Sequence, residues 1–175
     1  RSFFYIAINA CLGGGLVLDG NGHRGAMALS GEIGWLPIAD DRDKTAPKVD
    51  LLGEVVTMFF LYKFLGEHGV LASVPQDLLT LDARGKALVS KWLKEMSAHL
   101  AVAVKHIGMI VDPDAIIIGG RLPIRMIDEL LRYVHEHLTA GDSTLPTLHR
   151  ASIGEDASAL GAAAMPMAAA LMLAS

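Results

Sequence analysis

Three consecutive glycines between two apolar runs near the start of the chain constrain its fold more than any other feature. The first run covers residues 3–8, and a second, residues 16–18, follows the glycines Gly13, Gly14 and Gly15. Glycine has no side chain, so the backbone there can approach another backbone or a ligand closely. Two turn dipeptides follow at residues 19–22 and are typical of tight hairpin turns. The sequence therefore predicts an antiparallel hairpin.

Beyond the hairpin, predicted helices and strands alternate. We expect a polar surface loop over 39–50, a linker beginning at 75, helices over 51–66, 84–108, 123–138 and 158–173, and strands over 26–29, 115–118 and 148–153. The helix over 84–108 has apolar residues at helical spacing, and the Asp112-Pro113 pair ends it because the residue before proline disfavours the helical region. This order predicts one α/β domain, a mixed β-sheet flanked by helices.

Composition limits the possible functions and partners. The chain has 175 residues, enough for one domain with a real core, and a net charge of -4. Its lysines and arginines are scattered, so this part of the protein is not expected to bind nucleic acid by itself. Its one cysteine, Cys11, excludes an internal disulfide and is typical of a reducing compartment such as the cytoplasm. We expect Cys11 to be a small buried hydrophobe.

The apolar content is high, at 52% of residues. The uncharged stretch 157–175 is alanine-rich and contains Pro166, unlike the roughly 20 strongly apolar residues of a membrane-spanning helix. We expect instead that apolar faces meet another domain or subunit. The chain lacks an initiator methionine and opens directly in a predicted strand. We therefore expect it to be part of a longer protein.

A single carboxylate, Glu32, follows the hairpin in a loop with glycines on either side. A carboxylate accepts hydrogen bonds from hydroxyl groups. Beside side-chain-free backbone, Glu32 indicates a site for a small polyhydroxy or phosphate-bearing ligand.

The glycine hairpin, the GEIGW segment at 31–35, DPDAIIIGGR at 112–121 and GEDASALGAA at 154–163 together resemble the C-terminal half of the ROK family (repressors, open reading frames and sugar kinases). The resemblance covers essentially the whole chain in the right order. It implies an actin-like, ribonuclease-H-like fold, in which two lobes hold sugar and nucleotide between them. Residues 1–175 would form the second lobe, and the first lobe and any DNA-binding domain would lie outside this chain. In the family's kinases the catalytic base is an aspartate of the first lobe, so the resemblance implies no catalytic residue here.

The phosphate loop departs from the kinase pattern. Kinase members carry Gly-Thr-Gly-Ile-Gly-Gly-Gly where this chain reads Asn9-Ala10-Cys11-Leu12 followed by the three glycines. ATP phosphates need backbone N–H groups without side-chain obstruction, and here the hydroxyl and the first glycines are replaced. A phosphate-loop-like role for Gly13, Gly14 and Gly15 therefore stands beside a simpler alternative, in which they ease a bulge in a twisted hairpin.

The zinc site of the family is lost. Its one histidine and three cysteines correspond to Trp35, Thr45, Pro47 and Leu52, and none of these residues can bind zinc. We expect no metal and no other cofactor, and we expect Trp35 and Leu52 to pack where the metal would lie.

The resemblance also assigns ligand-binding roles. It implies that Glu32 and Glu54 accept hydrogen bonds from sugar hydroxyls. As alternatives, Glu32 is a plain loop residue and Glu54 an acid favoured by the dipole at a helix start. Gly119 and Gly120 match the segment under adenosine in the kinases, or they simply let the strand end turn into the next helix.

Three functions remain open at this point. The first is the sugar-sensing effector domain of a ROK-type transcriptional regulator, similar to N-acetylglucosamine and xylose repressors, which would contact DNA only through another domain. The second is the C-terminal lobe of a glucokinase-like sugar kinase using ATP and Mg²⁺. The third is a dimerisation module without ligand. In each case we expect a homo-oligomer, a dimer or tetramer, with no membrane partner.

Overall fold

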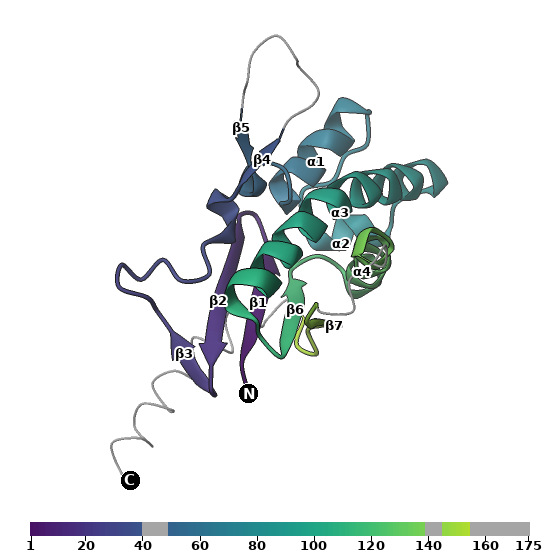
Figure 1. Cartoon of the computed structure of the whole chain (residues 1–175). Helices are drawn as coiled ribbons and strands as arrows, with labels where there is room; N and C mark the ends of the chain where they lie inside the picture. The colour runs from purple at the N-terminus through teal and green to yellow at the C-terminus, as the bar shows by residue number, and fades with distance from the viewer. Residues whose placement is uncertain (40–48, 139–144, 155–175) are drawn as a thin grey trace, which may run out of the picture.

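A five-stranded mixed β-sheet organises the molecule. The computed structural model describes residues 1–39, 49–138 and 145–154 (Figure 1). The strands are β1 (Phe3–Ile8), β2 (Leu12–Leu18), β3 (Asn21–His23), β6 (Ala115–Gly120) and β7 (Thr147–Arg150), in the spatial order β3-β2-β1-β6-β7. The β1–β2 and β2–β3 pairs are antiparallel, whereas β1–β6 and β6–β7 are parallel. The predicted hairpin and the mixed sheet are both confirmed.

The turn between β2 and β3 has the geometry that its sequence predicts. Leu18 pairs with Asn21, which leaves a two-residue turn of Asp19 and Gly20, both with positive φ angles of 51° and 82°. A turn of this type matches the right-handed twist of the strands that it joins.

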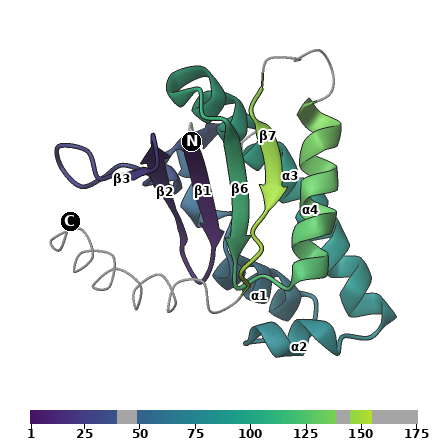
Figure 2. The ribbon, with the colours of Figure 1, turned by 90° about the horizontal axis from the view of Figure 1, so that it is seen from below.

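Two helices pack on one face of the sheet, as Figure 2 shows for α3 (Ala83–Val111) and α4 (Ile124–Leu138). The alternate residues Phe4, Ile6 and Ile8 of β1 are buried in this core. Every second side chain of a strand points to the same face, and the residues between them are only half buried.

The α3 helix confirms its sequence pattern. Asp82 caps its start, where its Oδ1 atom accepts a hydrogen bond of 2.7 Å from the Gly85 N–H. The helix ends at Val111, and Asp112 follows in the left-handed conformation before the proline. The predicted apolar stripe is buried at Trp92, Met96, Leu100, Val104 and Ile107, with Leu88 partly buried.

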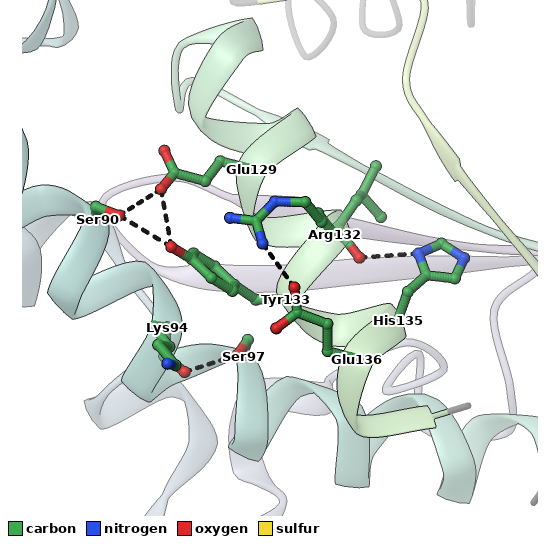
Figure 3. Close-up of polar contacts among 9 residues, drawn as sticks. Ser90, Lys94, Ser97, Glu129, Arg132, Tyr133, His135 and Glu136 are labelled. Carbon is green, nitrogen blue, oxygen red and sulfur yellow. Dashed lines mark hydrogen bonds and ion pairs between the residues drawn. The ribbon is translucent and has the colours of Figure 1, made fainter. Parts of the chain in front are cut away.

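A polar cluster joins α3 to α4 (Figure 3). Glu129 Oε1 accepts hydrogen bonds from the hydroxyls of Ser90, at 2.5 Å, and Tyr133, at 3.2 Å, and the two hydroxyls lie 3.0 Å apart. All three side chains are partly buried. The cluster therefore fixes α4 on α3 through groups that would otherwise need water.

Short elements complete the fold between the hairpin and α3. These are η1 (Ile33–Trp35), β4 (Pro37–Ala39), β5 (Val49–Leu51), η2 (Leu52–Glu54), α1 (Met58–Glu67) and α2 (Pro75–Leu79). Strands β4 and β5 form a separate antiparallel pair.

The prediction of a continuous helix over 51–66 was wrong in its first third. The chain there forms the end of β5 and the short turn η2, and α1 begins only at Met58. Thr57 caps α1, since its Oγ1 atom accepts the Phe60 N–H at 3.3 Å. A threonine cap competes with continuation of a helix in the N-terminal direction, and this signal was missed.

Two further predictions were corrected. Residues 26–29 form turns, not a strand, and Ala28 has a positive φ of 55°. The linker beginning at Pro75 contains the helix α2, whose start is capped by Asp77 Oδ2, which accepts the N–H groups of Ser73 and Val74 at 2.7 and 3.1 Å. These hydrogen bonds lower the pKa of Asp77. The predicted helix over 158–173 lies outside the described residues, as does most of the predicted loop over 39–50.

Candidate functional site

The turn between β1 and β2 lies at the carboxyl end of two parallel strands. Asn9 joins them, because its Oδ1 atom accepts the Arg121 N–H at 3.0 Å, and the Ile8 carbonyl accepts the same N–H at 3.0 Å. Ala10 and Cys11 at the tip are exposed. The prediction that Cys11 is buried was therefore wrong, because the turn projects it away from the sheet.

The three glycines lie within β2, and they differ in their surroundings. A Cβ atom on Gly14 would lie 2.6 Å from the Gly31 carbonyl oxygen, whereas one on Gly13 or Gly15 would meet nothing within 4 Å. The β1–β2 register is continuous along the whole strand, so the interpretation of the glycines as a bulge was wrong. Gly14 is needed for close backbone packing, and Gly13 and Gly15 leave backbone accessible.

The turns η1 and η2 pack directly on each other. A Cβ atom on Gly53 would lie 3.0 Å from the Gly34 carbonyl oxygen, and one on Gly34 would lie 2.8 Å from the Leu12 carbonyl oxygen. The Leu52 N–H also donates to the Leu36 carbonyl at 2.8 Å. Segments about twenty residues apart in the chain are thereby held together at the start of β2.

This packing places the two predicted sugar-binding acids on neighbouring turns. Glu32 directly precedes η1 and Glu54 ends η2, and both side chains are exposed. Glu54 Oε2 also accepts the Leu51 N–H at 3.1 Å, which stabilises the start of η2. Both carboxylates are accessible to a ligand.

A cavity of about 450 Å³ adjoins Glu54. Trp92, Met96 and Val55 are buried at its lining, and Phe60 and Phe64 are half buried. The remaining lining side chains are charged, namely Asp50, Lys63, Glu67 and Glu95. Glu32 does not line this cavity.

Sequence reasoning missed most of these lining residues. Phe60, Lys63, Phe64 and Glu67 are spaced three and four apart on α1, so they share one helix face. That spacing is a signal in the sequence. Their approach to Asp50 and to α3 is not, because it depends on how α1 packs in three dimensions.

The positions that correspond to the family's zinc ligands do not fit a metal. Leu52 is completely buried, as predicted, but Trp35 is 70% exposed, so the predicted packing of Trp35 was wrong. The short turn η1 directs the indole outward, and the other two positions lie outside the described residues. Within the described residues, no group of three His, Cys, Asp or Glu side chains could hold a metal ion.

Gly119 and Gly120 end β6 in a tightly packed segment. Gly120 has a φ of 114°, and a Cβ atom on it would lie 2.3 Å from the Ile8 carbonyl oxygen. A Cβ atom on Gly119 would lie 2.4 Å from the Tyr5 hydroxyl oxygen. Backbone packing alone therefore requires both glycines, and their role toward adenosine stays a prediction.

The strand order, the glycine-containing hairpin and the helices packed on the sheet together define one lobe of the actin-like, ribonuclease-H-like fold. The chain belongs to the ROK family, whose sequence model matches residues 1–168.

Similar proteins include both enzymes and a regulator. The bifunctional enzyme NanE/NanK of Brucella melitensis is 29% identical over 164 residues, which cover 93% of this chain and 30% of that protein. A ROK family protein from Streptococcus pneumoniae, solved in complex with sucrose, has a TM-score of 0.74 and 20% identity, covering 93% of this chain and 56% of the other. A ROK family transcriptional regulator, a homologue of the Escherichia coli MLC protein, has a TM-score of 0.56 and 17% identity, covering 85% and 41%. The chain thus spans less than two thirds of each of these proteins.

Proposed function

We propose that this chain is the sugar-binding lobe of a ROK protein that senses carbohydrate without transferring phosphate, as a transcriptional regulator does. The observation that carries the proposal is the β1–β2 turn. Asn9 Oδ1 and the Ile8 carbonyl both accept the N–H at the end of β6, and the exposed tip carries Ala10 and Cys11. Such a turn offers a phosphate no hydroxyl and no free glycine backbone.

Carbohydrate binding is supported by the two acids on neighbouring turns. Glu32 and Glu54 are exposed and can accept hydrogen bonds from sugar hydroxyls. A regulator needs only a sugar-dependent shift between two arrangements of its lobes. Neither zinc, ATP nor Mg²⁺ is required for that task, and we derive no chemical step through them.

A kinase lobe is the second candidate. It is favoured by the similarity to NanE/NanK, whose name is that of an enzyme. In that case positioned ATP and Mg²⁺ would transfer phosphate to a sugar hydroxyl, and the catalytic base would come from a lobe outside this chain. A dimerisation module without ligand is the third candidate.

One experiment separates the three candidates. The full-length protein is screened by thermal shift against glucose, xylose, N-acetylglucosamine, N-acetylmannosamine and sucrose, with and without Mg-ATP, and ADP release is measured in parallel. We expect stabilisation by at least one sugar without ATP, and no ADP release. Sugar-dependent ADP release would identify a kinase instead, and no response to any sugar would favour the dimerisation module.

Substitution of Glu32 tests the site itself. We expect Glu32→Ala to abolish the sugar-induced thermal shift, because loss of a hydrogen bond to a charged group costs about 1.5–3 kcal/mol, or roughly 10–100-fold in affinity. Glu136→Ala, which removes an exposed carboxylate from α4, is the matched control and should leave the shift unchanged. An unchanged shift in the Glu32 variant would remove this residue from the site.

A further inference from the structure

A second cavity, of about 280 Å³, lies beside the β1–β2 turn and shares no lining residue with the cavity at Glu54. Its lining is mainly apolar and comes from the turn, the start of α1, the start of α2 and the end of β6. The residues that matter below are Ala10, Met58, Phe59, Val74, Pro75 and Arg121.

Asn9 holds three of these segments together. Its carbonyl accepts the Met58 N–H at 2.9 Å, and its side chain accepts the Arg121 N–H at 3.0 Å. The cavity therefore lies outside the carboxyl ends of the parallel strands β1 and β6. In open α/β sheets this edge is where ligands characteristically bind.

Charge enters the cavity through one residue. Arg121 is exposed, and no hydrogen bond or ion pair with other described residues occupies its guanidinium group. A guanidinium group binds a carboxylate through two parallel hydrogen bonds. The cavity thus presents a single anion-binding group beside an apolar surface.

The rest of the lining selects an apolar ligand body. Phe59 and Val74 are 59% and 45% exposed, so apolar surface remains to be covered. The Ser73 hydroxyl, which also lines the cavity, is directed to Asp77 at 3.4 Å. A ligand body rich in polar atoms, such as an adenine ring, would leave hydrogen-bonding groups unpaired here.

Size narrows the ligand further. An apolar cavity of about 150 Å³ can hold benzene, so 280 Å³ accommodates one ring with a short side chain. We propose that this cavity binds a small carboxylic acid with an aromatic or branched aliphatic body, with its carboxylate on Arg121 and its body against Phe59 and Val74. The site is separate from the sugar-binding acids and does not depend on the function proposed above.

The test compares 3-phenylpropionate with its uncharged primary amide by isothermal titration on the purified full-length protein. We expect saturable binding of the acid and at least tenfold weaker binding of the amide. Arg121→Gln should weaken binding of the acid by a similar factor. Arg125→Gln removes an exposed guanidinium from α4 that does not line the cavity, and should have no effect.

A second readout needs no variant. Cys11 is exposed and follows Ala10 in the turn, so bound acid should slow its reaction with a thiol reagent, whereas the amide should not. The proposal is overturned if acid and amide bind equally, if Arg121→Gln binds the acid like the unmodified protein, or if the acid fails to saturate by about 10 mM, weaker than any specific site of interest. Saturable binding of adenosine monophosphate without binding of the acid would overturn it as well.

Discussion

At the scale of single residues, the glycines of β2 show why a motif in a sequence can have two different causes. Gly14 lies against the carbonyl oxygens of Gly31 and Tyr5, at distances that no Cβ atom could accept. Its neighbours Gly13 and Gly15 face open space. One glycine of the three is thus required by the fold, and the other two are available to a ligand.

This difference predicts opposite effects of two similar substitutions. Gly14→Ala should lower the free energy of unfolding by about 1–3 kcal/mol, because the new methyl group forces backbone apart. Since each kcal/mol corresponds to about 2–4 °C for a chain of this size, a thermal melt should show the loss clearly. Gly13→Ala is the control and should melt close to the unmodified protein. Equal melting temperatures for the two variants would contradict the packing described here.

Residue types alone predicted which acids to consider, but not how each is used. Glu54 was selected as a sugar acceptor, and it also stabilises the start of η2 through the Leu51 N–H. Exposure was harder to predict, because Cys11 and Trp35 are both exposed although apolar side chains are usually buried. Short turns decide the direction of these side chains, and such turns have weak sequence signals.

At the scale of elements, helix boundaries follow from capping, and helix positions follow from contacts between helices. The α3–α4 pair is an example (Figure 3). Arg132 and Glu136 form an ion pair of 2.6 Å within α4, but their side chains are 56% and 54% exposed. The Ser90, Glu129 and Tyr133 cluster lies between the helices and is partly buried.

Removing these two acids should therefore have different consequences. Glu129→Ala should lower the free energy of unfolding by about 1–3 kcal/mol, because two partly buried hydroxyls lose a charged acceptor. Glu136→Ala should cost about 0.5 kcal/mol or less, as for most exposed ion pairs. Chemical denaturation of both variants provides the measurement. A larger loss for Glu136→Ala would show that the interhelical cluster adds nothing.

At the scale of the whole molecule, apolar surface remains after folding. Val102, Met109 and Ile110 lie on one face of the C-terminal half of α3 and are 49%, 72% and 83% exposed. Within residues 1–39, 49–138 and 145–154, none of the helices combines the length and apolarity that a bilayer crossing requires. Apolar surface of this kind is typical of contacts between proteins.

We predict that a second copy of the chain covers this face of α3. Light scattering should give a mass above that of one chain, and Ile110→Glu should lower it, because a charge would be buried in the contact. Leu71→Glu changes a side chain that is 92% exposed elsewhere and is the control. A single-chain mass at high concentration would refute the prediction.

Sequence by itself determined the hairpin, the long helix α3, the strand β6 and the family, because each depends on local periodicity, turn residues or motif order. It also identified the two acids of the candidate site. Only the tertiary structure decided that η1 packs on η2, that Asn9 joins β1 to β6, and that two separate cavities form beside them. Those features arise from contacts between segments far apart in the chain, and the short-range preferences of the residues carry no record of such contacts.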